Sequence, residues 1–160
     1  MDGLGGAEAA IAAHKRTIGH SEALLDCAAC PPSASVTMLV IMVAEKLIGA
    51  IQHISTLLLT HTAVATECGG SEEKQTLKAE VRERGVALGA YTVDAPDEWA
   101  WILQVLCYVQ LRRLDNLLTR ALWRAEEARE PLQVQIAEQQ ETRLRAALRT
   151  FQRATLGLVS

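Results

Sequence analysis

Large aliphatic residues recur every seven positions in the first segment of the chain, about residues 7–29 and the residues just before it. These residues are Leu4, Ile11, Ile18 and Leu25, with alanines between them. A spacing of seven keeps side chains on one stripe of an α-helix, so the pattern predicts a helix with one buried side. Pro31 and Pro32 end it, because proline excludes the helical conformation from the residue before it.

A second segment, from Ser33 or Ser35 to about Thr62, is apolar on nearly every helical face. Either serine is a plausible N-cap. A helix that is apolar all round is expected to be the central and most buried one. Four polar residues interrupt its apolar run, which favours a core helix over a membrane span. They are Glu45, Lys46, Gln52 and His53.

Residues 68–84 are rich in charge and are open to two interpretations, a short surface helix or a mobile linker over about 66–84. Residues 85–94 carry two glycines and several β-favouring side chains, which disfavours a helix. We expect an ordered extended loop there. The side chains expected to pack from this loop are Val86, Leu88, Tyr91 and Val93.

A strong helix start follows, because Asp94 can cap and Pro96 stands in the first turn. Leucines spaced by three and four continue to about Arg129, Pro131 breaks the run, and a fifth segment covers residues 132–156. The fold class predicted is all-α. It is one domain over residues 1–160, a bundle of four to five helices around a central apolar helix.

Composition narrows the class of function. Hydrophobic residues make up 49% of the 160 residues and aromatic residues 4%, which predicts an aliphatic core. The net charge of −3 and the pI near 5.8 argue against direct nucleic-acid binding. The first residues show no basic stretch followed by an apolar run, so we expect no secretory signal, reduced cysteines and a cytoplasmic or nuclear protein.

Three pieces of sequence resemble the regulatory domain of fungal binuclear zinc-cluster transcription factors of the aflatoxin regulatory protein type. The first is Cys27-x-x-Cys30 followed by the long aliphatic segment with Lys46. The second, and most specific, is the loop over residues 86–97, which looks like the family's Gly-x-Tyr-x-aliphatic-Asp-x-x-acidic signature. The third is the leucine- and arginine-rich run over residues 110–118. Together they cover roughly residues 21–123.

Two departures from that family matter. Leu47, Ile48 and Gly49 stand where the family has an aromatic pair after the matching lysine. The zinc cluster that reads DNA is missing, because it needs six closely spaced cysteines and this chain has four scattered ones. The resemblance therefore implies a regulatory half without its own DNA-binding half, either cut from a longer protein or a stand-alone relative.

Polar residues within the apolar segments are the candidates for a ligand pocket. Glu45 and His53 can fall on one face, where they line a pocket or simply meet solvent. Tyr91 and Asp94 either edge a pocket together with Trp101 and Tyr108 or serve packing and capping. Trp99 and Trp101 are two apart, so we expect at least one of them to be exposed or at an interface.

Metal binding has little support. Cys27 and Cys30, with His14 and His20 upstream, make at most half of a tetrahedral zinc site, and two buried thiols or a redox-sensitive pair explain them as well. We therefore expect no metal and no cofactor.

Two hypotheses of function follow. The first is a regulatory domain of fungal secondary metabolism that binds a small apolar metabolite or a protein partner, or forms a homodimer, without contacting nucleic acid directly or a membrane. The second is a cofactor-free cyclase, dehydratase or isomerase acting on an apolar polyketide or terpenoid intermediate. Its candidate catalytic residues are His53, His61 and Asp94, and its candidate ligand-binding residues are Tyr91, Trp101, Tyr108 and Glu45. An enclosed pocket favours a metabolite site, whereas a solid core with exposed leucine and tryptophan favours a partner-binding module.

Overall fold

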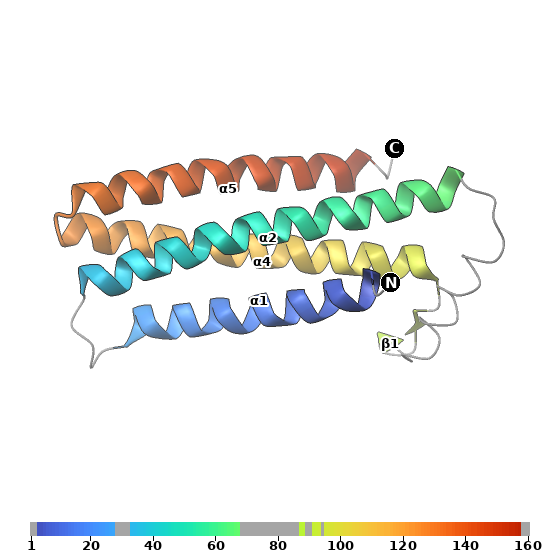
Figure 1. Ribbon diagram of the computed structural model, residues 1–160, viewed down its shortest axis with the longest axis horizontal. Helices are drawn as coiled ribbons and strands as arrows, with labels where there is room; N and C mark the ends of the chain where they lie inside the picture. The colour runs from blue at the N-terminus through green and yellow to red at the C-terminus, as the bar shows by residue number, and fades with distance from the viewer. Residues whose placement is uncertain (1–2, 28–32, 68–86, 89–90, 94, 158–160) are drawn as a thin grey trace.

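The computed structural model (Figure 1) describes residues 3–27, 33–67, 87–88, 91–93 and 95–157, and this part of the chain forms four long helices. They are α1 (Gly3–Asp26), α2 (Ala34–Glu67), α4 (Pro96–Glu127) and α5 (Pro131–Gly157). Two short strands, β1 (Ala87–Leu88) and β2 (Tyr91–Thr92), pair antiparallel and come between α2 and α4 in the sequence. The predicted all-α bundle is confirmed. The alternatives for residues 68–84 lie outside the described residues.

The helices alternate in direction along the chain, and α2 and α4 form the central pair (Figure 1). Each of these two packs against all three other helices, while α1 and α5 lie on opposite sides of the pair. The apolar second segment thus has the central place expected of it, but it shares that place with α4.

The helix starts follow from local chemistry. Ser33 caps α2, because its Oγ accepts a hydrogen bond from the backbone N–H of Val36 at 3.1 Å. The predicted cap of α4 by Asp94 is wrong, since Ala95 occupies the N-cap and makes no side-chain cap bond. Pro96 explains the shift: it holds Ala95 in an extended conformation and begins the helix itself. Asp94 lies outside the described residues.

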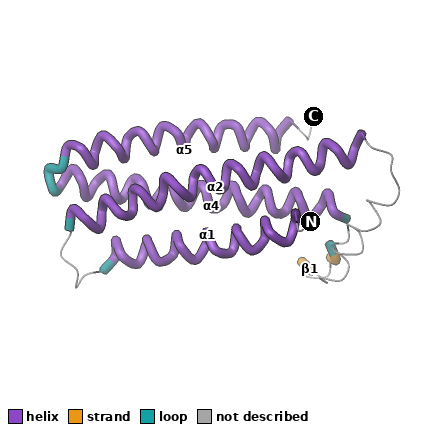
Figure 2. Tube along the Cα trace, in the orientation of Figure 1, coloured by secondary structure: helices purple, strands orange, loops and turns teal. Residues whose placement is uncertain are grey.

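A short turn joins α4 to α5 (Figure 2). The N–H of Glu130 donates to the carbonyl of Ala125 and the N–H of Arg129 donates to that of Glu126, both at 3.0 Å. These two bonds form a Schellman motif, in which the residue after the C-cap takes a left-handed conformation. Arg129 takes it here with φ 57°, and Pro131 then starts α5.

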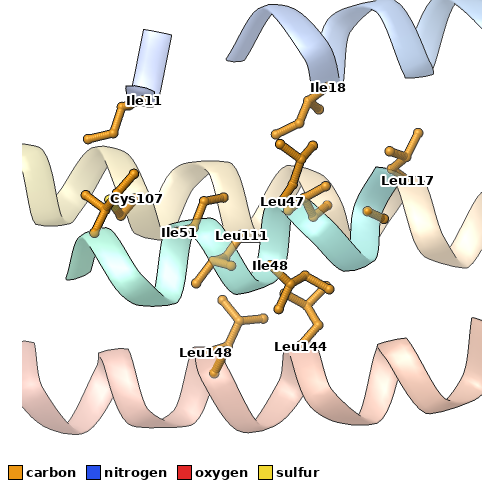
Figure 3. Packing of buried hydrophobic residues seen from close by; sticks show 14 of the residues in the cluster. Ile11, Ile18, Leu47, Ile48, Ile51, Cys107, Leu111, Leu117, Leu144 and Leu148 are labelled. Atoms are coloured by element: carbon orange, nitrogen blue, oxygen red, sulfur yellow. The ribbon is translucent and has the colours of Figure 1, made fainter. Parts of the chain in front are cut away.

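The core is aliphatic and continuous through the bundle (Figure 3). Ile11, Ile18 and Leu25 of α1 are all buried, which confirms the stripe with a spacing of seven. The side chain of Leu4 is outside the description. From α2, α4 and α5 the largest fully buried side chains are Ile41, Ile48, Ile51, Leu58, Leu103, Leu111, Leu114, Leu117, Leu118 and Leu144.

One side of α2 faces solvent along its described length, so the expectation of a helix buried all round is wrong. The exposed positions follow one another at spacings of three, four or seven residues, apart from the adjacent Thr56 and Leu57. They are Ser35, Leu39, Met42, Lys46, His53, Thr56, Leu57 and Thr60. Three neighbouring helices cover the other sides only, because a bundle of four leaves every helix an outer side. By length and composition alone, Ala34–Thr60 would suffice to cross a bilayer, with a mean hydropathy of 1.9.

Candidate interaction surface

Arginines of α4 hold α1 in place. Arg113 pairs with Glu22 through two contacts, Nη2–Oε2 at 2.5 Å and Nε–Oε1 at 3.3 Å. Two further contacts link the same helices, Arg120 with Asp26 and Arg124 with the carbonyl oxygen of Leu25. The spacing of seven and four residues between these arginines defines the side of α4 that faces α1.

Another side of α4 faces α5. Gln152 donates from Nε2 to the hydroxyl of Tyr108 at 3.4 Å, and Thr119 donates from Oγ1 to Glu141 Oε1 at 3.2 Å. Arg145 pairs with the other oxygen of Glu141 at 2.9 Å. Since the helices are antiparallel, these bonds set the register between them and place Arg145 near the level of Asp115.

The buried line of α4 between these two sides turns toward α2, the remaining neighbour. It consists of Leu103, Cys107, Gln110, Leu114, Leu117 and Ala121. The fourth side of the helix, opposite that line, contacts none of the other three described helices and faces away from them. Helical geometry assigns Val105 to the middle of the exposed side in the first half of α4.

Four residues on this outward side form a stripe that we call the α4 stripe. They are Trp101, Val105, Val109 and Arg112, at spacings of four, four and three. Trp101 is 51% exposed and Val109 is 44% exposed, although both are apolar. The Arg112 side chain is 59% exposed and lies 3.7 Å from Asp115. Val105 is half-buried.

The residue types of the stripe, rather than its exposed area, indicate that it is a binding surface. Trp, Tyr and Arg are the residue types that dominate binding energy in protein interfaces. Trp101 and Arg112 stand on the stripe, and Tyr108 stands beside it with a half-buried ring. The hydroxyl of Tyr108 accepts a hydrogen bond from Gln152 of α5, which links the ring to the neighbouring helix. These features are those of a docking surface.

The candidate ligand-site residues do not converge. His53 and Glu45 belong to α2, where His53 faces solvent and Glu45 is half-buried. Trp101 faces solvent from α4, and Tyr108 lies at the edge facing α5. The hypothesis that polar residues of α2 line an interior pocket is therefore wrong for His53. The side chains of His61, Tyr91 and Asp94 lie outside the described residues.

Burial affects two further groups, the Cys107 thiol and the His14 imidazole. Burial raises the pKa of the Cys107 thiol to about 12, which keeps it protonated and unreactive near neutral pH. Burial lowers the pKa of His14, which favours its neutral form. A surface depression of about 540 Å³ opens at the α4–α5 turn, beside Pro131 and Val134, and none of the candidate residues lines it.

Part of this surface could be read from the sequence and part was missed. The prediction that at least one of Trp99 and Trp101 is exposed is confirmed, since Trp99 is 6% exposed and Trp101 is 51% exposed. Val105, Val109 and Arg112 were missed. Their signal was the three-and-four spacing from Trp101. The leucine stripe of the same helix has the same spacing, so spacing alone does not separate the outward side from the buried one.

Comparison with protein-family models, with curated proteins and with solved structures gave no match to this chain.

Proposed function

We propose that this chain is a non-catalytic helical interaction domain that binds a second α-helix on the α4 stripe. The observation that carries the proposal is the exposed Trp101 aligned with Val105, Val109 and Arg112 on a helix that three neighbours hold rigidly. Docking of an amphipathic helix against an apolar surface is a common mode of recognition, and it uses anchors at this spacing.

The aliphatic core supports this proposal over a metabolite site. The described core side chains pack against one another in one cluster, and the depression at the α4–α5 turn is open to solvent. A regulatory role in fungal secondary metabolism stays a prediction from the sequence resemblance. The candidates of the enzymatic alternative whose side chains are described do not form one site, because His53 and Glu45 belong to α2 and Trp101 and Tyr108 to different sides of α4.

A matched pair of tryptophans tests the proposal. Trp123 is 62% exposed and also lies on the outward side of α4, but about 27 Å further along the helix than Val105 at 1.5 Å per residue. Fluorescence anisotropy would measure the binding of a panel of synthetic amphipathic helical peptides. The panel includes peptides with acidic, basic and neutral polar faces and one with residues 96–114 of this chain.

We expect at least one peptide to bind the wild-type chain and Trp123→Ala alike and to bind Trp101→Ala at least tenfold more weakly. Protein is kept dilute so that self-association does not compete. Binding that Trp101→Ala leaves unchanged, or no binding by any peptide, contradicts the proposal. Circular dichroism of both variants verifies that the helices are intact.

A further inference from the structure

We infer that the outward side of α2 binds the surface of an anionic lipid bilayer. This inference concerns a different side of the bundle from the α4 stripe and does not rest on helix binding there. Six exposed residues define the surface, which we call the α2 face. They are Leu39, Met42, Lys46, His53 and Leu57 of α2 and Arg143 of α5.

The apolar part of the α2 face is aliphatic and extends along the helix. The side chains of Leu39, Met42 and Leu57 are 53%, 49% and 45% exposed. At 1.5 Å per residue, Leu39 and Leu57 lie about 27 Å apart. Figure 1 shows α2 in front of α4, with α1 and α5 on either side, so this line follows the middle of one broad side of the bundle. The apolar headgroup boundary of a bilayer can accept such a line of side chains without a matched pocket.

Two permanent cations lie near the middle of this line. Gly49 has no side chain, and the guanidinium of Arg143 lies over it, with Nη2 3.6 Å from the place that a Cβ of residue 49 would take. Lys46 is one turn before Gly49 on α2, and His53, one turn after it, supplies a further N–H donor. Neither Lys46 nor Arg143 has an ion pair among the described residues. Both are therefore free to contact lipid phosphate groups.

The acidic side chains described for α1 and α5 lie away from the α2 face. Glu22 and Asp26 contact arginines of α4, and Glu141 accepts a hydrogen bond from a threonine of α4, so they mark the sides of α1 and α5 that face α4. Glu8 is fourteen residues before Glu22 and shares its side by helical spacing. Glu138 lines the depression at the α4–α5 turn. The described edges of α1 and α5 that border α2 therefore carry no carboxylate.

The remaining described acids confirm this separation of charge. Glu45 is the exception, since it belongs to α2, but it is half-buried while its neighbour Lys46 is exposed. All the others are on α4, pointing away from α2, or in the turn that follows it. They are Asp97, Glu98, Asp115, Glu126, Glu127 and Glu130. An anionic surface is thus attracted to the α2 face and repelled by the opposite side, although the whole chain has a net charge of −3.

The residue types favour a bilayer over a protein partner. Leucine is under-represented among the residues that dominate protein interfaces, whereas it partitions favourably into membranes. Lys46 and His53 are two of the polar residues that argue against α2 spanning a bilayer. A helix that lies on the bilayer instead requires such residues beside its apolar ones, because they meet the headgroups. The inference therefore departs from the sequence-based expectation of no membrane contact.

Flotation of the full chain with lipid vesicles tests the inference. We expect binding to vesicles of phosphatidylserine mixed with phosphatidylcholine, weaker binding as salt is raised, and little binding to phosphatidylcholine alone. Absence of binding to the phosphatidylserine vesicles overturns the inference, and so does equal binding to both kinds. Binding to soluble polyglutamate without binding to either vesicle would identify an acidic protein as the partner and also overturns it.

Matched lysines test the location. Lys46→Gln and Arg143→Gln are each expected to weaken vesicle binding about fivefold. Lys15→Gln is the control, because Lys15 is exposed but lies seven residues before Glu22, on the side of α1 that faces α4. It removes the same charge and is expected to leave binding unchanged. An equal loss in Lys15→Gln, or no loss in the other two, overturns the assignment to the α2 face.

The aliphatic contribution has its own test. Leu57→Gln keeps the charges and is expected to weaken vesicle binding, because a polar side chain at this position does not enter the apolar boundary of the bilayer. Circular dichroism verifies that all variants keep their helices. Unchanged binding by Leu57→Gln together with Leu39→Gln would show that the face recognises charge alone, which overturns the bilayer as its partner.

Discussion

The outward sides of α2 and α4 expose similar amounts of apolar side chain and yet differ in kind. On α2, Leu39 is 53% and Met42 is 49% exposed, while on α4 Trp101 is 51% and Val109 is 44% exposed. The two helices are the central pair of one bundle, so both have the same number of neighbours. Exposed area therefore does not separate them.

Side-chain type and charge do separate them. The exposed line of α2 is flexible aliphatic residues mixed with serine, threonine and histidine, and Lys46 is its one formal charge among the described residues. The α4 stripe has a tryptophan, two valines and the exposed guanidinium of Arg112. Stiff aromatic side chains lose less entropy on binding, and a charge at the edge of an apolar surface helps to select a partner. A docking surface is thus recognised by its residue types, not by its apolar area.

Inward substitutions give the largest expected effect and test whether the two helices contribute alike to the core. Ile48 of α2 and Leu114 of α4 are both fully buried. We expect Ile48→Ala and Leu114→Ala each to lower the free energy of unfolding by about 2–5 kcal/mol, because each leaves a cavity in the core. Urea denaturation measures this. A cost below about 1 kcal/mol at either site would show that the helix is not packed as described.

Outward substitutions to glutamate test the contrast directly. Val105→Glu places a carboxylate in the middle of the α4 stripe and is expected to weaken the binding of an amphipathic helical peptide more than tenfold, with little change in stability. Leu39→Glu, the matched change on α2, is expected to leave peptide binding unchanged. Fluorescence anisotropy measures both. The contrast between the two faces fails if Leu39→Glu weakens peptide binding as strongly as Val105→Glu.

The ion pair of Arg113 with Glu22 offers a smaller test of what fixes α4 against α1. Both side chains are about 30% exposed and meet at two points, so Arg113→Ala is expected to cost about 0.5–1 kcal/mol of unfolding free energy. Raising the salt concentration should shrink the difference. Arg112→Ala is the control, since its single 3.7 Å contact is more exposed and should contribute less. Equal losses in the two variants would contradict this account.

Periodicity alone predicted most of the fold. The four helices were recognisable because each carries an apolar line at helical spacing, and Ile11, Ile18 and Leu25 are buried as expected. The starts of α2 and α5 followed from Ser33 and Pro131. These features depend on residues that are close together in the sequence, so the sequence alone predicts them.

The outward sides could not be predicted in the same way. Hydrophobicity indicates that α2 is central but not which of its sides the neighbours leave open, since that depends on how helices distant in sequence pack. His53 was a candidate for a pocket for that reason, yet it faces solvent. Conversely, the sequence does not indicate that Val105 and Val109 face outward, and only the contacts of Arg113 and Tyr108 show that α1 and α5 flank opposite edges of α4.

Substitution of Arg129 in the turn after α4 gives the smallest expected effect. It is expected to change the unfolding free energy without changing binding at the α4 stripe. Arg129 holds φ 57° at a position where glycine is the common residue, and the left-handed conformation costs a side-chain-bearing residue about 1–2 kcal/mol. Glycine relieves this strain, but its greater freedom in the unfolded chain lowers the unfolding free energy by about 0.4–1 kcal/mol. Arg129→Gly is therefore expected to raise the unfolding free energy by about 0.5 kcal/mol in a urea titration, with Arg129→Ala as the control that keeps the strain. Because the α4 stripe lies at the other end of the helix, the dissociation constant of a peptide bound there should not change. A glycine variant less stable than wild type would show that the Arg129 side chain, rather than the backbone, stabilises the turn.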